Sequence, residues 1–261
     1  MELDNYKIYV NSDLTVIEQR ILVDIGFILG FYTISSTFPV TTVNSGKNTI
    51  KIVKNIGQEV AVHGSIIEVA VPEPDKYNDT LKEVAEIFQA ETEITEREVV
   101  TPRVYESASQ YAKEWKDRDF RQVQGLEALF DAGLFLNDMD NDLLPDSITA
   151  KILINASMTS KMLEAAINLA YRFGMEMTQA VLLFTTCPDD DTHREYTLIR
   201  FVTGAGFRVY LKRKNNCEFQ SASNILEICG DGNLLVDKIS RLCNNYPNLG
   251  EGADWQSFIL R

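Results

Sequence analysis

Four aspartates crowd one short stretch of this chain, DMDNDLLPD. They stand at positions 1, 3, 5 and 9 of that stretch, as Asp138, Asp140, Asp142 and Asp146. Alternate residues of a tight loop point toward one centre, and oxygen ligands suit a hard cation such as Ca²⁺. The spacing therefore predicts a calcium site at these four residues. The alternative is a hydrated acidic turn, in which the side chains bond their own backbone ahead of a strand at Lys151.

The same run resembles the aspartate loops of thrombospondin type 3 repeats, and more loosely those of dockerins and EF-hands. The resemblance implies calcium as the ligand; it covers nine residues and occurs once in the chain. Two positions depart from an EF-hand, because Leu143 stands where the turn glycine belongs and Thr149 stands where a bidentate glutamate belongs. No histidine or nucleophile accompanies the run, so we expect a metal there to have a structural role.

A second stretch, CPDDDTH, combines a thiol, three carboxylates and an imidazole: Cys187, Asp189, Asp190, Asp191 and His193. A thiolate activated by an imidazole can act as a nucleophile, which indicates a hydrolase-type site between the two halves of the chain. The neighbouring carboxylates oppose the negative charge that such a thiolate needs. They favour the alternative, an exposed loop after a strand. An enzyme requires these residues to converge in a pocket, whereas a loop spreads them apart.

Composition and the remaining motifs exclude several classes of function. The net charge of −13 repels phosphate backbones, so we expect no nucleic-acid partner. The apolar run 21–32 is broken by Asp24 and is too short to cross a bilayer, so we expect no membrane insertion. The N-terminus lacks the pattern of a signal peptide, which predicts a cytoplasmic location, or an extracytoplasmic one if a signal peptide has been cleaved. The glycine-containing stretches 203–206 and 230–232 are predicted to be turns, the first a hairpin, rather than nucleotide loops.

The elements that must position these residues come from an internal repeat. KIYVNSDLTVIEQRILVDIGFILGF begins at Lys7, and KILINASMTSKMLEAAINLAYRFGM begins at Lys151. At this constant offset five pairs are identical: Lys7/Lys151, Ile8/Ile152, Asn11/Asn155, Thr15/Thr159 and Gly30/Gly174. The repeat predicts two similar α/β domains.

Each copy is predicted to contain a strand, a helix, several strands and a closing helix. The first has strands at 7–10, 49–53, 59–63 and 66–71, and helices from Leu14 and at 79–88. The second has strands at 151–154, 181–184, 196–202, 207–212 and 224–229, and helices at 159–173 and 234–242. Asn11, Ser12 or Asp13 is expected to cap the first helix, and Gly30 and Gly174 to end the two long helices, because glycine readily enters the left-handed region.

This order predicts an α/β sandwich in each copy, with two helices on one sheet face. We assign residues 1–90 and 148–247 to the two duplicated domains, 91–147 to a charged, partly helical linker that includes the acidic loop, and 248–261 to a tail. The more apolar part of the linker, 124–136, is expected to pack on one of the domains.

Paired units of this kind resemble the accessory α/β domains that precede catalytic domains in some carbohydrate-active enzymes, and those of the bacterial cellulose synthase regulatory subunit. The resemblance rests on the openings 7–30 and 151–174 and implies a non-catalytic role. We therefore predict a scaffold or binding region of a larger bacterial protein, with a ligand or partner domain in the groove between the repeats. The alternatives are the hydrolase-type enzyme and a calcium-stabilised binding module.

Overall fold

The computed structural model describes residues 3–33, 38–44, 46–54, 59–91, 135–137, 147–177, 181–189, 196–213 and 224–245. These residues form two five-stranded mixed sheets, each with its own pair of helices. The predicted fold class, two α/β domains, is confirmed. The expectation of a charged, partly helical linker falls on residues outside the described ranges, apart from Glu91, 135–137 and Ser147.

Both halves follow the same order of elements. The first contains η1 (Leu3–Asn5), β1 (Lys7–Tyr9), α1 (Val16–Tyr32), β2 (Val40–Thr41), β3 (Thr49–Val53), β4 (Val60–His63), β5 (Ile66–Ala70), η2 (Pro74–Lys76) and α2 (Tyr77–Glu91). The second contains β8 (Ala150–Leu153), α4 (Ser160–Glu176), β9 (Thr185–Thr186), β10 (Thr197–Thr203), β11 (Arg208–Arg213), β12 (Asn224–Gly230) and α5 (Gly232–Asn245). A small ladder of β6 (Leu136–Asn137) and β7 (Ser147–Ile148) precedes the second half.

The two sheets also share their topology. The strand order is β2-β1-β3-β5-β4 in the first and β9-β8-β10-β12-β11 in the second. In each sheet, four strands run parallel to one another. The remaining strand, β4 in the first sheet and β11 in the second, runs antiparallel at one edge. The short second strand of each half, β2 or β9, forms the opposite edge. This edge is the one that meets the other half.

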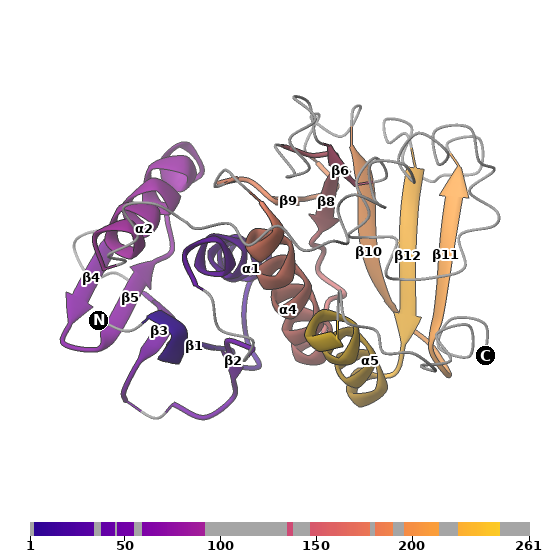
Figure 1. Ribbon diagram of the computed structural model, residues 1–261, viewed down its shortest axis with the longest axis horizontal. Coiled ribbons are helices and arrows are strands. Elements are labelled where there is room, and N and C mark those ends of the chain that lie inside the picture. Colours follow the sequence, from indigo (N-terminus) through magenta and orange to yellow (C-terminus); the bar gives the residue numbers. More distant parts are fainter. Residues whose placement is uncertain are drawn as a thin grey trace.

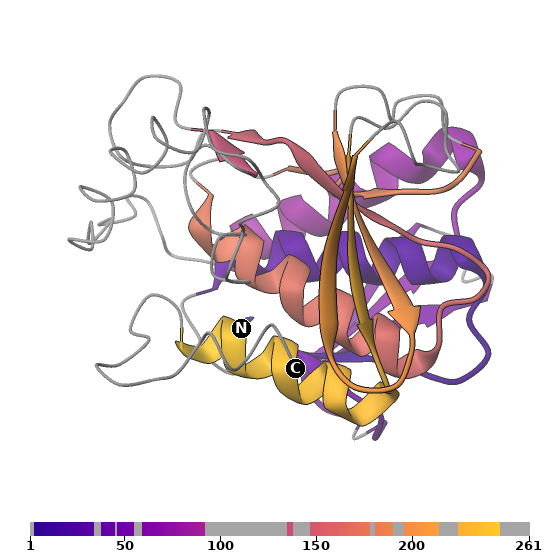
Figure 2. The same ribbon diagram turned by 90° about the vertical axis from the view of Figure 1, so that its right-hand side faces the viewer.

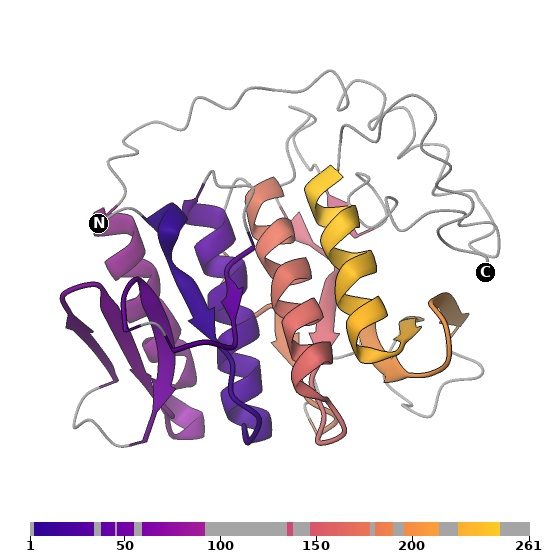
Figure 3. The same cartoon turned by 90° about the horizontal axis from the view of Figure 1, so that it is seen from below.

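The four helices lie between the two sheets in the row α2, α1, α4, α5 (Figure 3). The first sheet covers α1 and α2 on one side, and the second sheet covers α4 and α5 on the other (Figures 1 and 3). Seen from the end of the second half, the strands of its sheet pass in front of α4 and α5 (Figure 2). Each half therefore has both its helices on one sheet face, as predicted, and the two helical layers meet at α1 and α4.

The starts of the long helices were predicted within a few residues, but the capping residue was not. Thr15 caps α1: its hydroxyl accepts from the backbone N–H of Glu18, and the Glu18 carboxylate accepts from the backbone N–H of Thr15 at 2.6 Å. This reciprocal pair is a capping box. Thr159 caps α4 through one bond, in which its hydroxyl accepts from the N–H of Met162; methionine at that position gives no reciprocal bond. The prediction of a cap at Asn11, Ser12 or Asp13 is wrong, because the helix starts later, at Val16, directly after the extended residue Thr15.

Three predictions about strands need correction. Residues 181–184 do not form a strand; the short β9 follows them at Thr185–Thr186, and its counterpart β2 was not predicted. Two-residue strands carry too little pattern to be recognised. The turn at 203–206 does not close a hairpin, because β10 and β11 lie on opposite sides of β12. That connection instead crosses over the end of β12.

Gly30 and Gly174 lie inside their helices rather than at the ends, which corrects their predicted role. α1 continues to Tyr32 and α4 to Glu176. A Cβ atom on Gly30 would overlap the backbone carbonyl of Tyr171, and one on Gly174 would overlap the backbone carbonyl of Phe27. Tyr171 is the repeat counterpart of Phe27, so the two contacts are reciprocal. The absent side chains let the two helix backbones touch.

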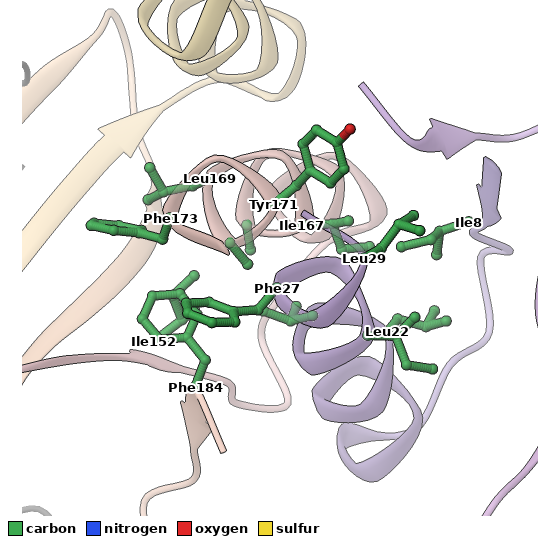
Figure 4. Packing of buried hydrophobic residues seen from close by; sticks show 14 of the residues in the cluster. Ile8, Leu22, Phe27, Leu29, Ile152, Ile167, Leu169, Tyr171, Phe173 and Phe184 are labelled. Carbon is green, nitrogen blue, oxygen red and sulfur yellow. The ribbon is translucent and has the colours of Figure 1, made fainter. Parts of the chain in front are cut away.

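One large hydrophobic cluster runs through both halves around this crossing, and a small second cluster of Leu153, Leu198 and Ile225 lies apart from it. Phe27 on α1 points toward Phe184 and Ile152 of the second half (Figure 4), and the ring centroids of Phe27 and Phe184 are 4.8 Å apart. On α4, the hydroxyl of Tyr171 forms a buried hydrogen bond of 2.7 Å with the hydroxyl of Thr33 in the first half. Each half thus places an aromatic side chain of its central helix against the other.

Candidate functional site

A buried carboxyl group, that of Asp24, lies where α1 meets the edge strand β9 of the other half. Its Oδ1 accepts hydrogen bonds from the backbone N–H groups of Phe184 (2.9 Å) and Thr185 (2.8 Å). Its Oδ2 accepts from the hydroxyls of Thr185 (2.8 Å) and Tyr77 (2.7 Å). The side chain therefore joins three elements: α1, the start of α2, and β9.

The local sequence explains how Asp24 reaches this position. It sits in the middle of α1, whose apolar residues occupy every side of the helix, so any polar residue at this point is buried. The outward-facing N–H group of Thr185 in β9 has no neighbouring strand to bond, since β9 is the edge of its sheet. Asp24 accepts from it and from the N–H group of Phe184, the residue before β9. It closes an edge that would otherwise expose unpaired backbone donors.

Complete burial changes the acidity of this carboxyl group. Asp24 is 0 % exposed, and desolvation raises its pKa from 3.8 to about 6, against the opposing effect of the hydrogen bonds from Tyr77 and Thr185 and of the Arg20 charge. Burial, followed by the Asp24 charge, also raises the pKa of the Tyr77 hydroxyl well above 10. Tyr77 is therefore a hydrogen-bond donor at all physiological pH values, and Asp24 titrates close to neutrality.

Arg20, one helical turn before Asp24, extends the cluster to the sequence-predicted thiol. Its Nε lies 3.4 Å from the hydroxyl of Thr185, and its Nη1 lies 3.7 Å from the Sγ of Cys187. Its guanidinium carbon is 5.0 Å from the centre of the Tyr77 ring, a cation–π distance. Cys187, half-buried, thus faces a cation of the other half.

The corresponding place in the other half holds no equivalent cluster. Asn168, the repeat counterpart of Asp24, is buried on α4, and its Nδ2 donates to Ser240 while its Oδ1 is without a hydrogen-bond partner among the described residues. Next to the edge strand β2 stands Pro39, which has no N–H to donate. Asp24 accepts from two backbone N–H groups next to β9, but its counterpart Asn168 cannot form the equivalent pair of bonds, because Pro39 lacks one of the two donors.

The residues predicted to form a hydrolase-type site are described only in part. Cys187 turns to Arg20, and Asp189 is exposed to solvent. Asp190, Asp191 and His193 lie outside the described residues. The structure places Arg20 against Cys187 and, through Arg20 and Thr185, connects the thiol to the Asp24 and Tyr77 cluster, which the sequence-based prediction did not include. The signal that could have found Asp24 is a charged residue in the middle of a helix that is otherwise apolar on all sides.

The four aspartates of the predicted calcium site, Asp138, Asp140, Asp142 and Asp146, also lie outside the described residues. The structure fixes the two ends of their loop: β6 pairs with β7 through Asn137 and Ser147, and the N–H of Thr149 donates to the carbonyl of Phe135 at 2.8 Å. Phe135 and Leu136 are buried, as expected for the apolar end of the linker. The acidic stretch thus connects two paired strands anchored in the core.

If these aspartates bind calcium, the protein melts at a higher temperature in millimolar Ca²⁺ than in EDTA. A ligand at about 100 times its dissociation constant stabilises the folded state by about 2.7 kcal/mol. The double variant Asp138→Asn/Asp140→Asn removes two charged ligands and should abolish the shift. Magnesium is a useful control, because its octahedral geometry tolerates such a loop poorly. Equal melting temperatures of the wild type in Ca²⁺ and EDTA would contradict the calcium prediction.

Fold and site together define a two-half α/β protein whose halves share a core and a buried polar cluster. No protein-family model matches the chain, and no curated protein matches it. Within the described residues, no group of three or more His, Cys, Asp or Glu side chains is placed to hold a metal ion. None of the helices in the described ranges has the length and apolar character needed to cross a membrane.

Proposed function

We propose that this chain is a non-catalytic scaffold or binding region in which two α/β halves, related by internal duplication, form one rigid body. The observation that carries the proposal is the burial of α1 between the halves. Ile21, Leu22, Ile25, Phe27 and Ile28 are all 0 % exposed, although they point in different directions around the helix. A helix that is apolar on every side must be covered on every side, so both halves are needed to cover α1.

The duplication is supported by the shared strand order of the two sheets and by the reciprocal contacts of Gly30 and Gly174. Two copies that meet through equivalent residues pack like the subunits of a symmetric dimer. Here the two copies belong to one chain and differ at their edge strands. The backbone of β9 donates a hydrogen bond to Asp24, whereas Pro39, next to β2, has no N–H group to donate.

The rigid crossing limits where a ligand can bind. At the α1–α4 crossing the helix backbones touch, so a ligand between the repeats has to lie beside this contact rather than within it. The outer face of the first sheet, which carries the Lys51–Glu68 ion pair, is left for a partner. On the second sheet, Leu153, Leu198 and Ile225 are already buried in a cluster of their own. A role as an accessory part of a larger bacterial protein fits such a body, since it presents surfaces in a fixed relation.

The buried cluster also favours a structural role over catalysis. A general base must approach the proton that it removes to within hydrogen-bonding distance. Asp24 is closed off from solvent, and all four of its hydrogen bonds go to groups of the protein itself. Among the described residues, the side chain that contacts the Cys187 thiol is the Arg20 guanidinium, which is a cation and not a general base. The nearby acid Asp189 is exposed to solvent.

A turnover assay separates the scaffold from the hydrolase-type enzyme. We expect the purified chain to hydrolyse p-nitrophenyl acetate, p-nitrophenyl phosphate and a p-nitrophenyl glycoside no faster than buffer does. Cys187→Ser is the test variant, and Cys229→Ser, at a half-buried thiol in β12, is its matched control. Hydrolysis that persists in Cys229→Ser but disappears in Cys187→Ser would establish an enzyme and remove the scaffold proposal.

A further inference from the structure

We propose that the Asp24 cluster is a proton-dependent clasp, which holds β9 of the second half to α1 and α2 of the first more tightly when Asp24 is protonated than when it is charged. This goes beyond a scaffold role, because it makes the strength of the contact between the halves depend on pH. The geometry of the two carboxyl oxygens, the completeness of burial and the position of the nearest cation support it.

The two oxygens of Asp24 have different kinds of neighbour. Oδ1 faces two backbone N–H groups, which can only donate. Oδ2 faces the hydroxyls of Thr185 and Tyr77, which can donate or accept. A proton on Oδ2 can therefore be donated to one of these hydroxyls while Oδ1 keeps both of its amide bonds. The site accommodates the neutral acid without losing its contacts to β9.

The charged form accepts all four hydrogen bonds but is held without any contact with solvent. A buried carboxylate loses its hydration, and an opposite charge has to lie close by to offset that loss. Among the described residues, the groups that act on Asp24 are Tyr77 from α2, Thr185 from β9 and Arg20 from its own helix. Arg20 is the cation among them, and its hydrogen bonds go to Thr185 and Cys187, so it acts on Asp24 through space.

The direction of the pH effect follows from the acidity of the group. Desolvation places the pKa of Asp24 at about 6 in the folded chain, compared with 3.8 for an ordinary aspartate. The folded state then holds a proton that the unfolded state has already released. Stability from this group is complete below pH 4 and falls as pH rises toward 6. A pKa difference of about two units corresponds to a decrease of roughly 100-fold in the folding equilibrium constant.

The experiment compares the urea unfolding of the wild type and Asp24→Asn between pH 4 and pH 7.5. Asparagine keeps the shape and the hydrogen bonds but cannot titrate. Since all other groups are shared, the ratio of the two folding constants isolates Asp24, and we expect it to change by roughly 100-fold in favour of the variant as pH rises. Asp79→Asn, an exposed acid on α2, is the control and should leave the wild-type profile unchanged.

A second measurement does not depend on the variant folding. The amide protons of Phe184 and Thr185 donate to Asp24, so their NMR shifts should titrate together with a midpoint near pH 6 in the wild type. Tyr77→Phe removes one donor to the carboxylate and should move that midpoint upward. Parallel stability profiles of wild type and Asp24→Asn, or an amide midpoint below pH 5, would each overturn the clasp.

Discussion

Gly30→Ala and Gly174→Ala are each expected to lower the free energy of unfolding by about 3 kcal/mol, although alanine is the better helix former by about 1 kcal/mol. The new methyl group at either position would overlap a backbone carbonyl of the opposite helix, that of Tyr171 or that of Phe27. A backbone atom in a packed helix pair cannot rotate away, so α1 and α4 must move apart. That separation loosens the shared core on both sides of the crossing.

Gly26→Ala is the matched control, since it lies one turn earlier on α1 and has the same helical backbone. Its methyl group would come 2.9 Å from Cγ2 and 3.3 Å from the carbonyl oxygen of Ile167, a milder overlap than the direct backbone clash at Gly30 or Gly174. We expect its unfolding free energy to stay within about 1 kcal/mol of the wild type, because the gain in helix propensity offsets the crowding.

Urea unfolding followed by circular dichroism measures all three variants. The combination Gly30→Ala/Gly174→Ala should cost less than the sum of its parts, because the first separation of the helices relieves the second contact. Equal effects at Gly26, Gly30 and Gly174 would show that helix propensity, rather than the close crossing, governs these positions.

Asp24→Ala is expected to destabilise the protein by about 3 to 5 kcal/mol at pH 7, and Asp24→Asn by no more than about 1 kcal/mol. Alanine leaves the N–H groups of Phe184 and Thr185 and two hydroxyls without their acceptor inside the protein, and an unsatisfied buried polar group costs about 1–3 kcal/mol. Asparagine can accept from both amides through its oxygen and donate to the two hydroxyls through its nitrogen.

The comparison tests whether shape and hydrogen bonding, rather than charge, make the cluster important. Thermal melts and amide hydrogen exchange at Thr185 provide the measurements, because the loss of the acceptor should raise exchange at β9 before the rest of the sheet opens. Similar stabilities of Asp24→Ala and wild type would show that β9 does not depend on α1. A large loss in Asp24→Asn would instead assign the stabilisation to the negative charge.

Much of the fold could be predicted because it depends on local pattern. The apolar spacing of α1 and α4, the β-rich runs of β3, β5 and β12, and the repeat between Lys7 and Lys151 are visible in neighbouring residues. These signals depend on the periodicity of helices and strands. The same reasoning failed at β2 and β9, which are two residues long and are defined by pairing with β1 and β8.

The candidate site could be predicted far less well, because its members are distant in sequence. Cys187 was predicted as a nucleophile or as part of an exposed loop, but its neighbour Arg20 lies in the other half, and Asp24 meets Thr185 across the same boundary. Such contacts depend on how the two halves dock. The calcium site at the four aspartates stays a prediction. The same holds for the part that Asp190, Asp191 and His193 would play in a hydrolase-type site.

Two α/β halves with the same order of elements follow from the amino-acid sequence, because hydrophobic periodicity and a constant offset are local and repeated properties. How those halves use their central helices depends on the way they dock. Gly30 and Gly174 are glycines near the ends of helices, where glycine often ends a helix, yet they are the points where α1 and α4 touch. Asp24, inside an apolar helix, accepts a hydrogen bond from a strand of the other half. The physical reason is that a glycine or a buried carboxylate acquires its role from the backbone that is brought against it.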